Sequence, residues 1–395
     1  MLNTPFSPWP CFSQEEADAV SKVLLSNKVN YWTGAECREF EKEFAQFSDS
    51  KFAVAVANGT LALDLALVGL GVSSGDEVVV TPRTFLASVS SIINSGATPV
   101  FADVDENSQN ITAATIRKAL TTSTKAIVCV HLAGMPCEMD EIMELAEEHN
   151  LYVIEDCAQA HGARYKGRSV GSIGHVGAWS FCQDKIMSTG GEGGMVTTND
   201  LALWNKMWSY KDHGKSWDAV YTKEHPPGFR WLHESFGTNW RLTEMQSAIG
   251  RIQLQRMPEW NALRNKNAST IEKTLAKFKF IRVVSIPSYI QHAQYKYYAF
   301  VSPELLPVGW GRDRIVEEIS NLGVPCFQGS CSEVYLEKAF DSTDFRPTRE
   351  MEVAKILGDT SLMFLVHPTL TALEVEKMCD VISSVLSMVE YDASK

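Results

Sequence analysis

Hydrophobic positions along the first half of the chain follow two different patterns. Between residues 52 and 198, short runs that are apolar throughout alternate with longer segments whose apolar residues recur every three or four positions. The first pattern is typical of strands buried on both faces, and the second is typical of amphipathic helices. The sequence therefore predicts the α/β class, with a mostly parallel sheet sandwiched by helices.

The elements of this half can be placed by residue number. The predicted strands are 52–57, 77–81, 98–102, 126–131, 151–156, 177–181 and 194–198. The predicted helices among them are 61–70, 85–94 and 138–149, and a further helix is predicted over 36–47. Residues 1–12 are expected to form an extended arm. The arm leads into a helix with Ser13 as N-cap and Glu16 completing a capping box. The apolar residues of that helix are Ala17, Val20, Leu24 and Leu25.

The second half of the chain is less regular. Residues 201–235 are rich in Trp, Lys, His and Pro, which predicts an irregular, lid-like segment. Helices are predicted over 243–257 and 259–278, and the second of these should lead into a smaller α+β domain. That domain should contain a strand at 295–301 and helices at 313–322 and 371–389. The expected division is a large domain over 1–255, arm included, and a small domain over 256–395.

The composition of the chain disfavours several classes of function. The 395 residues include 36 Lys and Arg against 48 Asp and Glu, a net charge of −12, and an acidic chain without a basic patch disfavours nucleic acid as a partner. No apolar run approaches the length of a membrane span, and the first residues do not form a signal peptide. Nine scattered cysteines suit free thiols in a cytoplasmic protein, and no residues show metal-ligand spacing.

A lysine in a glycine-rich loop is the first candidate for chemistry. Lys185 lies between the strands predicted at 177–181 and 194–198, and four glycines follow it within 190–194. Glycines allow positive φ and close approach to a ligand, and a lysine placed there can form a Schiff base. The same pattern also fits a solvated lysine beside a glycine-rich hairpin, so the neighbouring segments must decide.

Ligands of parallel sheets bind at the carboxyl ends of the strands. This rule brings the Asn58-Gly59-Thr60 turn, the turn at 83–85, Asp156 and Lys185 to one edge. The helix that starts after Asn58 can hold a phosphate through its first N–H groups, although Thr60 could simply cap it.

Two further residues at this edge suit a planar cationic ligand. Asp156 ends an apolar strand, and a buried carboxylate needs a cation such as a protonated pyridine nitrogen, a structural salt bridge being the alternative. Phe85 can stack on a flat ring or belong to the core. Taken together with Lys185 and the phosphate turn, the set is that of a pyridoxal phosphate site. No Gly-x-Gly-x-x-Gly follows a strand, which disfavours a nicotinamide dehydrogenase.

Several ordered motifs resemble the nucleotide-sugar aminotransferases of the DegT/StrS type, which are fold type I pyridoxal-phosphate enzymes. The motifs lie at 155–162, 180–185, 191–194 and 239–246. Cys157 stands where many members have alanine, and Gln183-Asp184 stand where histidine or asparagine is common. The similarity runs from about residue 40 to the terminal helix.

The resemblance implies a role for each matching residue. Lys185 would form the internal aldimine and move the proton, and Asp156 would pair with the pyridinium nitrogen. Gln159 would lie near the phenolic oxygen of the cofactor, and Phe85 would stack on its ring. The phosphate would be held by Gly59, Thr60, Leu61 and Ser180.

The resemblance also implies a homodimer with shared active sites. The segment matching 239–241 reaches the phosphate of the neighbouring subunit in this family. Asn239 is favoured for that contact, and Arg241 remains open. Three residues of the 201–240 segment, His213, Lys215 and Arg230, are expected to contact the sugar nucleotide.

The activity implied is transfer of an amino group from L-glutamate to a nucleotide-linked keto-deoxy sugar. A UDP-4-keto-6-deoxy-HexNAc used in surface-glycan amino-sugar biosynthesis is favoured, with dTDP-linked sugars and 3-keto sugars as alternatives. A pyridoxal-dependent sugar dehydratase is another alternative, although dehydratases of this family carry histidine in place of the lysine. A non-catalytic regulatory relative is the alternative from outside enzymology.

Overall fold

The computed structural model describes residues 5–224 and 231–394, and its centre is a seven-stranded sheet in the order β1-β9-β8-β5-β4-β2-β3. The strands are β1 (Phe52–Val56), β2 (Glu77–Val80), β3 (Thr98–Phe101), β4 (Thr124–Val130), β5 (Tyr152–Asp156), β8 (Val176–Ser180) and β9 (Gly194–Thr198). Neighbours from β8 to β3 are parallel, and β9 is antiparallel to both of its neighbours. The predicted mostly parallel sheet is confirmed, and β1 points the same way as β8.

Successive residues of the central strands β2, β4 and β5 feed two separate cores, as a two-residue period requires. In β2, Val78 and Val80 join the core on one face, and Val79 joins the core on the other. The helices around this sheet are α2 (Glu36–Phe47), α3 (Gly59–Leu70), α4 (Ala87–Asn94), α5 (Ala113–Arg117), α6 (Met139–His149) and α7 (Leu201–Tyr210). The sheet is therefore sandwiched by helices, as predicted.

A smaller unit follows in the chain. Its antiparallel sheet has the order β10-β12-β14-β13. The elements of this unit are β10 (Ile281–Val283), β12 (Tyr297–Val301), α10 (Arg312–Asn321), β13 (Cys326–Phe327), α11 (Glu352–Thr360), β14 (Ser361–Phe364) and α12 (Ala372–Ala393). A third, three-stranded sheet joins β11 (Ile290–Gln291) to β6 (Arg164–Tyr165) and β7 (Arg168–Ser169).

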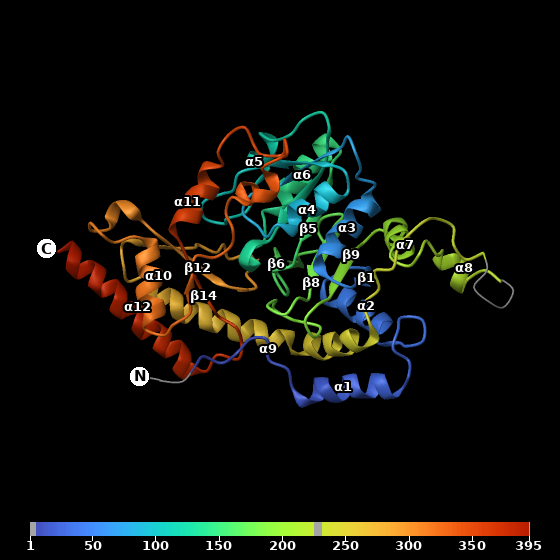
Figure 1. Cartoon of the computed structure of the whole chain (residues 1–395), viewed down its shortest axis with the longest axis horizontal. Coiled ribbons are helices and arrows are strands. Elements are labelled where there is room, and N and C mark those ends of the chain that lie inside the picture. Colours follow the sequence, from blue (N-terminus) through green and yellow to red (C-terminus); the bar gives the residue numbers. More distant parts are fainter. Residues whose placement is uncertain (1–4, 225–230, 395) are drawn as a thin grey trace.

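One long helix, α9 (Glu244–Leu275), links the two units (Figure 1). The prediction of two helices separated at residue 258 is wrong, because Pro258 lies inside this continuous helix. Residues on both sides of the proline, such as Met257 and Arg264, are buried, and α9 packs against α1 (Gln14–Leu25), α2 and α12. This packing outweighs the loss of one main-chain hydrogen bond at the proline. The domain boundary predicted between 255 and 256 falls within α9 and stays a prediction.

Helix α1 has the predicted cap and a different buried face. The N–H of Ser13 donates to the Glu16 carboxylate at 2.6 Å, which confirms the capping box. Leu24 and Leu25 are exposed, whereas Glu16 and Val23 are buried. The burial of Glu16 follows from its contacts across α9, where it accepts hydrogen bonds from the Gln253 and Arg256 side chains. A polar contact, not the apolar spacing, therefore orients α1.

The segment predicted to be irregular over 201–235 contains two helices. The first is α7, whose N-terminus is capped by the Asp200 carboxylate, and the second is α8 (Trp217–Tyr221). Met207 and Trp208 bury one side of α7, so its aromatic residues belong to the core. Within the described part of the chain, no helix has the length and apolar character needed to cross a bilayer.

Candidate active site

The start of α3 lies against the end of β8. The side-chain oxygen of Asn58 accepts a hydrogen bond from the N–H of Leu61 at 2.9 Å, so Asn58 caps α3 and the Thr60 hydroxyl is not needed for that task. A Cβ added to Gly59 would lie 2.5 Å from the Ser180 Cβ. Only glycine allows this close approach, which places the first N–H groups of α3 beside the Ser180 hydroxyl. Such a group of donors at a helix N-terminus suits a phosphate.

Asp156 ends β5 with a buried carboxylate. Its two oxygens accept hydrogen bonds from the Ser88 hydroxyl at 2.7 Å and the Ala158 N–H at 3.1 Å. Burial raises the pKa of Asp156, although these hydrogen bonds and the nearby Lys185 oppose the rise. The carboxylate forms no ion pair with any residue that the structure describes. A cationic ligand group placed against it would remove the cost of its burial.

The loop before α4 joins Asp156 to an exposed aromatic ring. The Thr84 hydroxyl lies 2.8 Å from the Ser88 hydroxyl, which in turn donates to Asp156. Between them, Phe85 is 72% exposed, a large value for a phenylalanine flanked by buried residues. The loop is also tied to the smaller unit, because the N–H of Thr84 donates to the Cys331 carbonyl oxygen. A free aromatic face held beside a buried carboxylate suits a planar ring.

Lys185 lies in the turn after β8. Its N–H donates to the Cys182 carbonyl oxygen at 3.1 Å, and its amine lies 3.7 Å from Asp184 and 5.2 Å from the centre of the Tyr295 ring. The Tyr295 hydroxyl donates to the other Asp184 oxygen. The lysine side chain is 17% exposed, so it is neither a core residue nor a freely solvated one.

The N-terminal arm reaches this same loop. The indole N–H of Trp9 donates to the Lys185 carbonyl oxygen at 2.8 Å. The arm is held at its other side by the smaller unit, where the Ser7 hydroxyl donates to Glu374 and the Thr369 hydroxyl donates to the Pro8 carbonyl oxygen. No spacing along the chain predicts these contacts, since Trp9 and Lys185 are 176 residues apart.

Two more polar residues follow Asp156 in the chain. The side-chain oxygen of Gln159 accepts a hydrogen bond from the Ala133 N–H at 2.8 Å, which fixes the amide beside the strand ends. His161 is fully buried against Trp179 and Phe181, and burial lowers its pKa to about 3. The imidazole is therefore neutral at physiological pH.

The segment at 239–241 is anchored by Asp212. This buried carboxylate lies 2.6 Å from the Arg241 guanidinium and 3.2 Å from the Lys215 amine. Asn239 and His213, in contrast, are exposed. Arg230, the remaining residue predicted to contact the sugar nucleotide, lies outside the described residues.

One buried cluster has the composition of a metal site. His131, Glu155 and Cys157 bring their side-chain atoms within 4.8 Å of one another. The Glu155 oxygens, however, accept hydrogen bonds from the N–H groups of Gly171, Ile173 and Gly174 as well as from His131. The other His131 nitrogen accepts from the Cys137 N–H. These bonds already use the groups that would bind a metal, so the cluster is a structural network.

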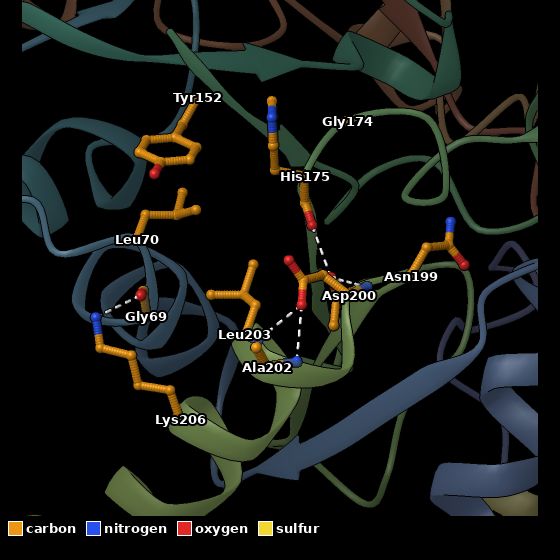
Figure 2. A pocket seen from close by; sticks show the side chains of 11 residues that line it. Gly69, Leu70, Tyr152, Gly174, His175, Asn199, Asp200, Ala202, Leu203 and Lys206 are labelled. Carbon is orange, nitrogen blue, oxygen red and sulfur yellow. Dashed lines mark hydrogen bonds between the residues drawn. The ribbon is translucent and has the colours of Figure 1, made fainter. Parts of the chain in front are cut away.

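A cavity of about 540 Å³ lies at the opposite edge of the sheet (Figure 2). Tyr152 and His175 line it near the starts of β5 and β8, whereas Asp156 and Ser180 end those strands. The Lys206 amine closes one side by donating to the Gly69 carbonyl oxygen at 2.7 Å. This cavity is therefore separate from the edge that carries Lys185.

The residues at the Lys185 edge fit pyridoxal phosphate. They provide an amine, a buried carboxylate without a cation, an exposed aromatic face, and a helix N-terminus that a Cβ would obstruct. Asp156, Phe85, Gly59 and Lys185 were predicted from the sequence, and the parallel strands do bring them to one edge. Trp9, Ser88 and Tyr295 were not predicted to contribute, and Asn58 was predicted as part of the phosphate turn but not as the cap of α3.

Comparisons with known proteins agree with this set. The family model described as DegT/DnrJ/EryC1/StrS aminotransferase family matches residues 10–383. A relative named GDP-perosamine synthase, from Caulobacter vibrioides, is 36% identical over 351 residues, covering 88% of this chain and 89% of the relative. A relative named UDP-N-acetyl-3-dehydro-alpha-D-glucosamine 3-aminotransferase, from Acidithiobacillus ferrooxidans, is 39% identical and covers 68% of each chain.

Two solved structures have the same fold. The aminotransferase from Psychrobacter cryohalolentis is 64% identical, with a TM-score of 0.97 over 98% of this chain and all of that chain. DesV of S. venezuelae, solved in complex with a ketimine intermediate, is 30% identical, with a TM-score of 0.85 over 97% of this chain and 99% of that chain.

Proposed function

Because the chain belongs to the DegT/DnrJ/EryC1/StrS aminotransferase family, we propose that it moves an amino group from L-glutamate to a nucleotide-linked keto-deoxy sugar. The protein has the fold of type I aminotransferases and is a pyridoxal-phosphate-dependent nucleotide-sugar aminotransferase. The bound cofactor supplies an aldehyde that accepts the amino group from the donor and passes it to the sugar. The observation that carries the proposal is the Lys185 amine at the strand edge that also holds the buried Asp156 carboxylate.

Each predicted site residue of the chain would have a distinct role. Lys185 would bind the cofactor's aldehyde carbon and, once displaced by the donor, carry a proton on Nζ between the carbon atoms that exchange the amino group. Asp156 would pair with the ring nitrogen and keep it protonated. Phe85 would cover one face of the ring, and Gln159 would lie near the phenolic oxygen. The phosphate would be held by Gly59, Thr60, Leu61 and Ser180.

The second subunit would complete each site in a homodimer. Arg241 is committed to Asp212 in its own chain, whereas Asn239 is exposed at the end of the same anchored segment. This difference supports Asn239 as the residue that reaches the neighbour's phosphate. His213 is the exposed candidate for the sugar nucleotide. Lys215, also proposed for that contact, lies against Asp212 and would act mainly by holding the segment in place.

The proposed acceptor is a UDP-4-keto-6-deoxy-HexNAc, used to make an amino sugar of a surface glycan. The relatives' names support a nucleotide sugar and differ in the nucleotide, GDP in one and UDP in the other. The name of the second relative also specifies amination at position 3, which keeps a 3-keto UDP-sugar as the second candidate.

The first test is the visible absorption spectrum of the purified protein before and after L-glutamate is added. We expect a yellow band that bleaches with glutamate in the wild type, and no turnover in Lys185→Ala. A panel of GDP-, UDP- and dTDP-linked keto sugars should then restore the band, and mass spectrometry of the product identifies the sugar. Loss of a hydroxyl in place of gain of nitrogen would identify a dehydratase, and a protein that never bleaches would fit a regulator.

A further inference from the structure

Two additional cations lie behind the Lys185 amine. The Lys296 amine lies 4.9 Å from the centre of the Tyr295 ring, and the Lys185 amine lies 5.2 Å from the same centre. The two amines are therefore no more than about 10 Å apart. Arg264 lies beneath them, 1% exposed, and donates to the Tyr295 carbonyl oxygen at 3.3 Å.

These cations are poorly compensated. Neither Arg264 nor Lys296 forms an ion pair with a residue in the described ranges, and the Nε and Nη2 groups of Arg264 have no hydrogen-bond partner there. Burial lowers the pKa of Lys296 to about 8 and that of Arg264 to about 9. The carboxylate that interacts with both amines is Asp184. Lys185 and Lys296 therefore share one carboxylate, and the buried Arg264 adds a third positive charge at the Tyr295 main chain.

We propose that Lys296, supported by the charge of Arg264, binds a carboxylate of the amino donor and of the keto acid that leaves. This inference rests on the proposed function, and it names the residue that recognises the first substrate. L-Glutamate must bring its amino group to the Lys185 position, and its carboxylates must then lie among these cations. A donor carboxylate beside Lys296 would give a charge-assisted hydrogen bond to this partly buried amine, which forms no ion pair with the described residues.

Tyr295 lies close to both amines, the Lys185 amine that would react and the Lys296 amine that would bind the carboxylate. Its ring centre lies 5.2 Å from the Lys185 amine and 4.9 Å from the Lys296 amine, and its hydroxyl donates to Asp184. Among the described residues, none forms a hydrogen bond or ion pair with the Lys296 amine, although Asp184 lies close enough to interact with its charge. The keto sugar carries no carboxylate, so Lys296 should matter for one half-reaction and not for the other.

The experiment uses the holoenzyme and three variants. Lys296→Met removes the charge and keeps most of the side-chain volume, Lys296→Arg keeps the charge, and Lys206→Met is a control at the opposite edge of the sheet. The glutamate dependence of bleaching is measured by stopped flow. The binding of glutarate, a dicarboxylate without an amine, is measured by calorimetry, and the Michaelis constant of the keto sugar is measured separately.

In Lys296→Met we expect about a tenfold or greater rise in the glutamate concentration for half-maximal bleaching, and a similar loss of glutarate affinity. Lys296→Arg should restore most of both, and Lys206→Met should change neither. The Michaelis constant for the keto sugar should stay within about twofold. Unchanged glutamate and glutarate dependence in Lys296→Met would overturn the inference, as would an equal rise for the sugar. A wild type that bleaches with no amino acid would overturn the proposed function itself.

Discussion

Replacing Asp156 by asparagine should make the cofactor-free protein more stable and the loaded enzyme slower. The carboxylate is buried, and burial raises its pKa. Asparagine can keep both of its hydrogen bonds, with its oxygen accepting from the Ala158 N–H and its amide donating to the Ser88 hydroxyl. The substitution therefore removes a buried charge and leaves no polar group without a partner.

The size of the effect follows from two opposing contributions. A buried ion carries an effective penalty of several kcal/mol, and each hydrogen bond to a charged group returns about 1.5–3 kcal/mol. Asparagine keeps two neutral hydrogen bonds worth about 0.5–1.5 kcal/mol each, so only the excess strength of the charged bonds offsets the penalty, and the cofactor-free Asp156→Asn protein should be about 1–2 kcal/mol more stable at pH 7. In the loaded enzyme the ring nitrogen loses its charged partner, worth about 1.5–3 kcal/mol, so the half-reaction should slow by about 10- to 100-fold.

The pH dependence has a definite sign. Asp156 has a raised pKa in the folded protein, so its penalty is fully present at neutral pH and fades as pH falls through that raised value. Below the ordinary aspartate pKa of about 3.9 the penalty is gone. The advantage of Asp156→Asn should shrink over the same window.

Urea denaturation of the two cofactor-free proteins at pH 7 and pH 5 measures the stability difference, and stopped-flow bleaching with glutamate measures the rate. Asp140→Asn is the matched control, because the Asp140 carboxylate is paired with Lys166 and Arg168. That variant should gain no stability. A cofactor-free Asp156→Asn protein that is less stable than the wild type would show that the folded chain already compensates the carboxylate, and the argument for a cationic ligand would fail.

Three further predictions follow from the described contacts. Gly59→Ala should weaken cofactor affinity about tenfold or more, because the added Cβ would meet Ser180. Gly311→Ala is the control, since a Cβ there has nothing within 4 Å, and it should leave the affinity unchanged. Titration with pyridoxal phosphate compares the two variants. Glu155→Ala should lower the free energy of unfolding by about 3 kcal/mol or more in urea, since three main-chain N–H groups lose their acceptor. The pKa of Glu155 is lowered, so its contribution should be lost only as pH falls below about 4.3, and pH-independent stability would contradict this. Asp212→Ala leaves Lys215 and Arg241 unpaired and should lower the free energy of unfolding, measured with heat or urea, by about 3–5 kcal/mol. It should also weaken the proposed dimer in sedimentation. A loss of stability below about 1 kcal/mol would refute the anchoring role.

The sheet and its functional edge could be predicted because both depend on local patterns. Each apolar run is a strand, and the direction of parallel strands brings their carboxyl ends together, so Gly59, Asp156 and Lys185 needed no knowledge of packing to be placed on one edge. The helical parts were harder. Pro258 indicates a break by local rules, but contacts on both sides of it keep α9 continuous. The orientation of α1 likewise depends on Glu16 meeting a distant helix.

The unpredicted parts of the site come from contacts between distant residues. Trp9 lies far before the Lys185 loop in the sequence and Tyr295 lies far after it, so no local spacing indicates that the two residues meet this loop. Ser88 is different. It lies four residues after Thr84, in the first turn of α4, and a second hydroxyl this close in the sequence could have indicated a partner for Asp156.

Because of the contacts made by the N-terminal arm, the order of synthesis affects when the candidate active site can be completed. Trp9 is synthesised long before Thr369 and Glu374, the residues of the smaller unit that hold the arm. The arm can therefore be held with Trp9 on the Lys185 carbonyl oxygen only after residues 369–374 have been made. The loop that carries Lys185 thus gains this contact only after the smaller unit has been made, and a chain truncated before residue 369 would have the sheet without the held arm.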